Sequence, residues 1–173
     1  DIKFIGKRSI KITGTKELIS GTHNIISDRI EAFSYLCVGA ITNKQIKVNN
    51  INPKYLRTEI GILKKIGYKI EINSNSILLS PAKKLNSVKI KTGPWPAFAT
   101  DNMPLILAVL TKVPGKSQIE ETIFSNRFMA APELKRMGAS IKIKKNKAII
   151  IGKKELNGAD CISSDLRTTF SII

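Results

Sequence analysis

The chain has 173 residues, of which 42% are hydrophobic, and a formal net charge of +16 at pH 7. This length and composition favour a globular protein with one good core or two small ones, and no apolar run approaches the roughly 18 residues that a membrane span needs. The N-terminus has no signal-peptide pattern, so we expect a cytoplasmic protein with no membrane partner.

The positive charge is spread along the chain and is carried mostly by Lys. Abundant Lys and Ile are typical of AT-rich codon usage. The densest basic run, residues 142–147, contains no aromatic side chain on which a base could stack. A basic module that binds RNA or DNA therefore stays open as an alternative, but this pattern disfavours it.

Few side chains are candidates for metal binding or nucleophilic chemistry. Cys37 and Cys161 are far apart and have no CxxC pattern or neighbouring His, which disfavours zinc and a disulfide framework. Both lie among apolar residues, so we expect buried hydrophobic side chains. We expect His23 to be an ordinary loop or strand residue. No metal and no organic cofactor is indicated.

Hydrophobic periodicity predicts the elements in chain order. Helical spacing predicts a helix over 29–41, and alternation predicts a strand over 45–49. Asn52 and Pro53 start a second helix that Gly67 ends, and a hairpin follows over 69–80. The same order then recurs as strand 87–92, helix 102–113, strand 117–122, helix 131–137 and hairpin 140–151.

An internal repeat explains this recurrence. Residues 63–75 resemble residues 134–146 at a constant offset. Leu-Lys-Lys-Ile-Gly in the first segment corresponds to Leu-Lys-Arg-Met-Gly in the second. We infer a β-α-β-α-β-β unit that occurs at about 9–86 and again at 87–157, and a third copy that starts at 158–173. We expect the chain to be a piece of a longer protein.

A Ser or Thr followed by Asp marks the start of the first helix of each unit, at Ser27-Asp28, Thr100-Asp101 and Ser164-Asp165. Each pair fits an N-cap, whose side-chain oxygen accepts hydrogen bonds from the first helical turn. Units packed side by side bring these junctions to one end, where their charged residues can share a pocket. Capping alone stays open as the role of the three aspartates.

Five motifs in sequence order carry a resemblance to a known family. They are Asp28-Arg29-Ile30-Glu31; Pro96-Ala97-Phe98-Ala99-Thr100-Asp101; Glu121-Thr122-Ile123-Phe124 with Asn126-Arg127-Phe128-Met129; Pro132-Glu133-Leu134 with Arg136-Met137-Gly138-Ala139; and Asp165-Leu166-Arg167. Over nearly the whole chain they resemble the enolpyruvyl transferases. The second and third motifs are similar to the branch that acts on UDP-N-acetylglucosamine rather than to the shikimate-pathway branch.

The resemblance implies an α/β fold, an inside-out barrel of repeated β-α-β-α-β-β units with helices inside and sheets outside. Residues 1–173 would form most of one of two domains. The implied reaction transfers the enolpyruvyl group of phosphoenolpyruvate to the 3'-hydroxyl of UDP-N-acetylglucosamine, with release of phosphate, in peptidoglycan synthesis. The family's reactive Cys has no counterpart in this chain. We therefore expect the chain alone to be inactive without its missing half, and an inactive truncated fragment stays open as an alternative.

The resemblance also implies roles for single residues. Asp101 resembles the acid that holds the sugar 3'-hydroxyl and takes its proton. The prolines before Asp101 stiffen the segment that leads to it and so fix its position. The residues that resemble UDP-sugar contacts are Thr100, Ile123 and Phe124. The charged set implied around phosphoenolpyruvate is Arg127, Asp165 and Arg167, with Arg29, Asp28 and Glu31 in the same cleft. Surface ion pairing stays open for Arg127 and Arg167, and Trp95 is expected at a packing or rim position.

Overall fold

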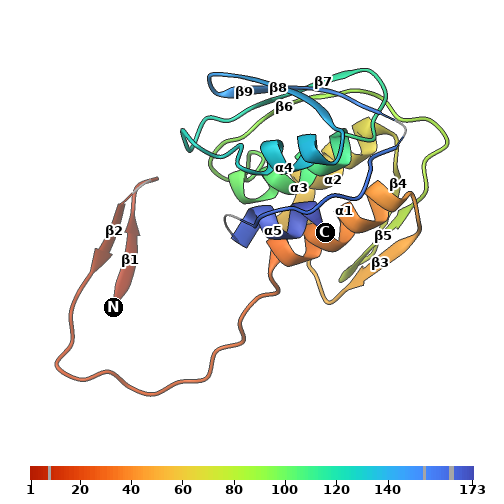
Figure 1. Ribbon diagram of the computed structural model, residues 1–173. Coiled ribbons are helices and arrows are strands. Elements are labelled where there is room, and N and C mark those ends of the chain that lie inside the picture. Colours follow the sequence, from red (N-terminus) through yellow and green to blue (C-terminus); the bar gives the residue numbers. More distant parts are fainter. Residues whose placement is uncertain (8, 154, 164–165) are drawn as a thin grey trace.

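The computed structural model describes residues 1–7, 9–153, 155–163 and 166–173. Helix α3 (Met103–Leu110) is apolar throughout and buried at every residue. Because a helix that is apolar on all sides belongs in an interior, α3 forms the centre of the main body. It packs against α1 (Arg29–Thr42) and α5 (Leu166–Ile172), and it also contacts α4 (Ala130–Arg136). The helices lie inside and two sheets lie outside them (Figure 1).

The first sheet follows α1 in the chain. Strand β3 (Ile46–Asn49) leads to a 3-10 turn, η1 (Pro53–Leu56), and to helix α2 (Arg57–Ile66). Strands β4 (Lys69–Ile72) and β5 (Ser76–Ser80) then form a hairpin. All three strands are antiparallel, in the order β3-β5-β4. Ile77 and Leu79 of β5 are fully buried, so this sheet turns its apolar face towards the helices.

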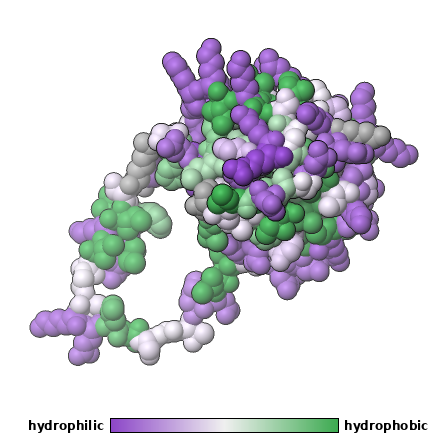
Figure 2. All heavy atoms as spheres, in the orientation of Figure 1, coloured by the Kyte–Doolittle hydropathy of each residue, from purple (hydrophilic) through white to green (hydrophobic). Residues whose placement is uncertain are grey.

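The second sheet contains β6 (Lys89–Lys91), β7 (Lys116–Glu120), β8 (Ser140–Lys144) and β9 (Lys147–Ile151), in the order β6-β7-β9-β8. Strand β6 runs parallel to β7, and the other pairs are antiparallel. Between β6 and α3 the chain forms a 3-10 turn, η2 (Thr100–Asn102). Ile119 and Ile150 face the core, and Figure 2 shows hydrophilic side chains projecting from this part of the molecule.

The predicted helices and strands are confirmed from residue 29 onwards, with ends that differ by a few residues. The element order α1-β3-α2-β4-β5 recurs as α3-β7-α4-β8-β9. The α/β class is therefore confirmed. Within the described residues the sheets are open, with three and four strands in the main body, and no closed barrel forms. No helix in the described part of the chain has the length and apolarity needed to cross a membrane.

The N-terminal segment lies apart from the main body. Strands β1 (Ile2–Ile5) and β2 (Ser9–Ile12) form an antiparallel hairpin, and the exposed residues 13–28 connect it to α1 (Figure 1). Apolar side chains such as Phe4 and Ile12 are exposed there. Figure 2 shows hydrophobic residues gathered on this segment, away from the main body. Strand β6 pairs with β7 of the main body, whereas β2 pairs with β1.

Candidate functional site

The first turns of α1, α3 and α5 meet at one end of the helical layer. Arg167, in the first turn of α5, lies with Nη2 3.6 Å from Oδ2 of Asp101 at the start of α3. Arg167 also lines a pocket of about 180 Å³ together with Asp28 and Glu31 from the start of α1. The expected convergence of the charged junctions is therefore confirmed for these residues. Asp165 lies outside the described residues.

Asp28 and Asp101 use their carboxylates differently. Asp28 caps α1, with Oδ1 accepting hydrogen bonds from the backbone N–H groups of Ile30 (2.7 Å) and Glu31 (3.4 Å). For Asp101 the alternative of capping alone is not supported, because the residue lies inside η2, whose N-cap is Ala99 and has no side-chain cap hydrogen bond. Its carboxylate instead faces two arginines.

Arg127 is the second arginine, from the loop between β7 and α4. Its Nη2 donates to Oδ1 of Asp101, and its Nε donates to the carbonyl oxygen of Thr100 at 3.4 Å. The guanidinium carbon lies 5.5 Å from the ring centroid of Phe124. The Arg127 side chain is 21% exposed, compared with 40% for Asp101 and 35% for Arg167. Each group is held by protein contacts and still reaches solvent, as a ligand-binding group requires.

A residue without a predicted role, Glu121, organises this loop. It is 2% exposed and follows β7 directly. Oε1 accepts hydrogen bonds from the Thr92 hydroxyl (2.8 Å) and from the backbone N–H groups of Ile123 (2.7 Å) and Phe124 (3.2 Å). Oε2 accepts one from the Thr100 hydroxyl at 2.8 Å. The strand alternation that buries Ser117 and Ile119 also points Glu121 inward, and that signal was available in the sequence.

A second residue without a predicted role, Glu59, contacts η2 at the residue after Asp101. It is 2% exposed, and its Oε1 accepts a hydrogen bond from Nδ2 of Asn102 at 3.0 Å. Asn102 is fully buried. Glu59 belongs to the apolar stripe of α2, since it lies three residues after Leu56 and four before Leu63. A carboxylate on such a stripe is a signal for a specific polar contact.

The remaining candidates differ in their exposure and in their place in the fold. Ile123 and Phe124 are 42% and 54% exposed, so their side chains reach solvent beside Arg127. Trp95 is 67% exposed, which fits the predicted rim position. Arg29 is half-buried and is not among the residues that line the Asp28 pocket. His23 is exposed in the N-terminal connection.

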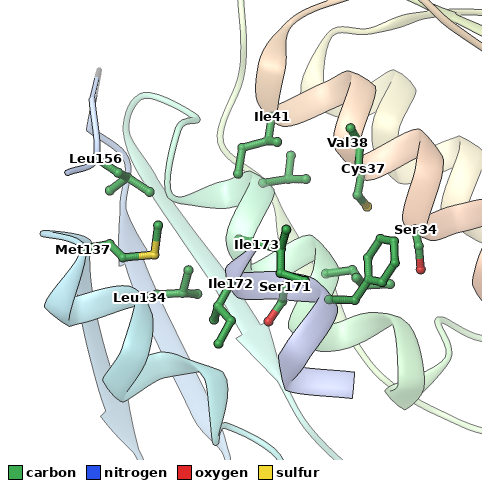
Figure 3. Close-up of a pocket in the computed structure, with 14 residues that line it drawn as sticks. Ser34, Cys37, Val38, Ile41, Leu134, Met137, Leu156, Ser171, Ile172 and Ile173 are labelled. Carbon is green, nitrogen blue, oxygen red and sulfur yellow. The ribbon is translucent and has the colours of Figure 1, made fainter. Parts of the chain in front are cut away.

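A separate apolar pocket of about 110 Å³ lies between α1, α3, α4 and α5. Figure 3 shows Cys37 and Ser34 of α1 and Leu134 of α4 around it, together with Ile172 and Ile173 at the end of the chain. Burial, with a smaller contribution from Glu59, raises the pKa of the Cys37 thiol well above its ordinary value. Cys37 therefore stays a protonated, unreactive thiol at neutral pH, as predicted. Cys161 is only partly buried, in contrast to the prediction.

The sequence pattern of the EPSP synthase (3-phosphoshikimate 1-carboxyvinyltransferase) family matches residues 1–173. The chain belongs to this family. It is 42% identical over 173 residues to the UDP-N-acetylglucosamine 1-carboxyvinyltransferase of Pelagibacter ubique, and 45% identical over 175 residues to that of Helicobacter pylori. All of this chain is covered in both matches, and it spans 42% of the length of each relative.

Solved structures agree with this family assignment at the level of the fold. The enolpyruvyl transferase NikO from Streptomyces tendae superposes with a TM-score of 0.76 at 20% identity, over 86% of this chain and 36% of its own. EPSP synthase from Acinetobacter baumannii superposes with a TM-score of 0.63 at 16% identity, over 88% of this chain and 37% of its own.

Proposed function

We propose that the chain is part of a transferase that moves the enolpyruvyl group of phosphoenolpyruvate to the 3'-hydroxyl of UDP-N-acetylglucosamine, a step of peptidoglycan synthesis in the cytoplasm. The observation that carries the proposal is the placement of Asp101 between Arg127 and Arg167. The relatives that share 42–45% of the sequence bear the name of this enzyme. Their names point to the UDP-sugar rather than to shikimate 3-phosphate as the acceptor.

In this proposal Asp101 accepts the proton of the sugar 3'-hydroxyl as that oxygen bonds to C2 of phosphoenolpyruvate. C3 takes up a proton in this addition, from an acid in the other half of the enzyme. C3 then loses a proton as the bond from C2 to the phosphate oxygen breaks, so the carbon–carbon double bond re-forms and phosphate leaves. A carboxylate that is already held in place saves the cost of orienting it during the reaction. Arg127 and Arg167 carry the donors that suit the carboxylate and phosphate of phosphoenolpyruvate, because a guanidinium binds oxyanions in a bidentate manner.

The acceptor sugar would lie against the loop after β7. Thr100, Ile123 and Phe124 are proposed to contact the UDP-sugar, and the exposed side chains of Ile123 and Phe124 offer an apolar wall beside Arg127. Asp165 and Arg29 complete the proposed charged set. Support for Asp28 and Glu31 in the same cleft comes from the pocket that they share with Arg167.

The chain is further proposed to contain repeat units at about 9–86 and 87–157 and the start of a third at 158–173. The recurring element order and the inner position of α3 support this division. In the complete protein, further units would close the helical layer inside an outer wall of sheets, which is the inside-out barrel. A second half of the enzyme would supply the reactive Cys and the remaining substrate contacts.

The test uses a chimera in which residues 1–173 replace the matching segment of the Helicobacter pylori relative. We expect phosphate release that requires both substrates, and none from residues 1–173 alone. Asp101→Asn should lower kcat roughly 10²- to 10⁴-fold, as the loss of a general base does. Asp160→Asn, at an exposed position, is the matched control and should leave the rate unchanged.

Two outcomes would contradict the proposal. A well-folded chimera without phosphate release would exclude this reaction for the chain, and nearly full activity of the Asp101→Asn variant would exclude the role of Asp101. Salt-sensitive binding of the chain to a polyanion column, with no response to UDP-N-acetylglucosamine, would instead favour the nucleic-acid alternative.

A further inference from the structure

Two buried glutamates hold the turn that carries Asp101, one on each side. Glu121 accepts the hydroxyl of Thr100 at 2.8 Å, and Glu59 accepts the side-chain amide of Asn102 at 3.0 Å. Thr100, Asp101 and Asn102 are the three residues of η2. Both neighbours of Asp101 are therefore tied to a carboxylate that is 2% exposed. We refer to Glu59 and Glu121 as the glutamate clamp.

The two halves of the clamp come from different parts of the fold. Glu59 lies in α2 of the first proposed repeat, and Glu121 follows β7 of the second. The neighbouring Thr58 adds a further link, because its hydroxyl donates to the carbonyl oxygen of Pro96 at 2.6 Å. Helix α2 thus contacts the chain both before and after Asp101, at Pro96 and at Asn102. No residue of α2 carries a predicted role in the site.

Burying a carboxylate is costly unless hydrogen bonds replace the lost water. For Glu121, four donated hydrogen bonds offset this cost, and they also fix the loop that holds Arg127. Glu59 has one hydrogen bond among the described contacts, and Oδ1 of Asn102 has none within the described residues. An apolar pair would fill this space at lower cost, so the polar pair indicates a requirement for a fixed orientation.

The turn also sets the position of Arg127. Its Nε donates to the carbonyl oxygen of Thr100, and its Nη2 donates to Asp101. A shift of η2 would therefore move the carboxylate and one of its two arginines together. The clamp acts on both through backbone placement, because neither glutamate has a described contact with Asp101 or Arg127 itself.

We propose that Glu59 and Glu121 are positioning residues for Asp101 and Arg127. By binding the two neighbours of Asp101 in the chain, they hold η2 so that the carboxylate meets the acceptor hydroxyl in a reactive geometry. This rests on the proposed function of Asp101. A displacement of about 1 Å at a reacting group can lower a rate roughly 100-fold. Loss of a clamp hydrogen bond that lets η2 shift by a similar distance should therefore lower turnover strongly.

The first experiment is independent of activity and uses residues 1–173. Hydrogen exchange of the Arg127 Nε–H is measured by NMR in the parent chain and in Glu59→Ala and Glu121→Ala. We expect exchange at least roughly 10-fold faster in both variants, because η2 no longer holds the Thr100 carbonyl oxygen in place. Ile150 is fully buried in β9, so we expect Ile150→Val to lower the thermal midpoint and to leave this exchange rate unchanged.

The second experiment measures kcat and KM in the chimera. Glu59→Ala and Glu121→Ala should each lower kcat roughly 10- to 100-fold with a smaller change in KM, and Glu59→Gln should recover part of the loss because its side-chain oxygen still accepts from Asn102. In the Asp101→Asn background the same alanine changes should lower kcat by a smaller factor than in the parent chimera, because the part of their effect that acts through Asp101 is already lost.

The outcomes separate this inference from the proposed function. Unchanged Arg127 exchange in either alanine variant overturns the clamp, whatever the activity. Full additivity with Asp101→Asn also overturns it, because a general loss of stability would act independently of Asp101. A chimera without activity, with faster Arg127 exchange in both variants, would contradict the proposed reaction and still support the clamp.

Discussion

Asp101 and Arg127 are paired across 26 positions of the chain, with the guanidinium of Arg127 donating to the carboxylate in η2. The pair joins the turn before α3 to the loop before α4, so it fixes these two segments against each other. Arg167 approaches the other carboxylate oxygen from α5. Three segments thus share one acidic group, and changing any of the three side chains tests the site.

Arg127→Lys tests whether the shape of the guanidinium matters. Lys keeps the charge but lacks the planar guanidinium, whose separate Nε and Nη2 groups donate to the Thr100 carbonyl oxygen and to Asp101. We expect kcat/KM of the chimera to fall roughly 100-fold, which corresponds to about 3 kcal/mol of transition-state stabilisation. Arg57→Lys, at an exposed position, is the control. Equal kcat/KM for the parent and Arg127→Lys would show that Arg127 provides charge alone.

Asp28→Ala tests the cap of α1. The Asp28 carboxylate accepts hydrogen bonds from two backbone N–H groups, and their loss should lower the free energy of unfolding by about 1 kcal/mol. Asp28→Ser should recover most of it, because a Ser hydroxyl also caps helices. Urea unfolding of residues 1–173 measures both changes. A destabilisation by Asp28→Ala that Asp28→Ser does not reduce would show that the carboxylate acts through charge rather than through capping.

The elements and the family motifs could be predicted because they depend on local patterns. Periodicity places α1 and the two hairpins, and the repeat explains their order. The convergence of the helix starts followed from repetition of the unit. The role of Asp101 at its helix start could not be predicted this way, because a Thr-Asp pair before a helix fits both a cap and an ion pair with a distant arginine.

The glutamate clamp shows what local patterns miss. Glu59 and Glu121 each occupy an inward position in an otherwise regular element, and the partner of each becomes visible only when α2, β7 and η2 are packed together. The N-terminal hairpin is a second case. The repeated unit predicts a strand at its start, near residue 9. The sequence pattern does not fix the pairing partner of that strand, and β2 pairs with β1 rather than with a strand of the main body.

Gly67 and Gly138 form a matched pair, since they occupy equivalent places in the repeat, after α2 and α4. Their φ angles are 125° and 91°, which strain any residue with a side chain. A Cβ at Gly67 would lie 2.3 Å from the carbonyl oxygen of Lys84, whereas a Cβ at Gly138 would have its nearest neighbour at 3.9 Å. Gly138→Ala should cost roughly 1–2 kcal/mol of stability, and Gly67→Ala should cost more. Urea unfolding should rank the two variants in this order, and the reverse order would contradict the packing around Gly67.

Ionisation of the buried Tyr68 side chain should lower the free energy of unfolding at high pH. Its side chain is 3% exposed, and its hydroxyl donates to the Ala40 carbonyl oxygen at 2.7 Å. Burial, with a smaller contribution from Cys37, raises the pKa of Tyr68 to about 12. An unfolded Tyr ionises near pH 10, so the neutral phenol favours the folded state below about pH 10, and this contribution is lost as the pH rises towards 12.

A difference of two pKa units corresponds to about 3 kcal/mol, so the free energy of unfolding should fall by up to that amount across this window. Urea unfolding at several pH values from about 8 to 11.5 measures the fall, and ultraviolet absorbance follows phenol ionisation. Tyr68→Phe should be less stable near pH 8, because the hydrogen bond to Ala40 is lost, but should lose less stability at higher pH. If the parent and the Phe variant lose the same free energy between about pH 10 and 11.5, the loss has another source and Tyr68 is not its cause.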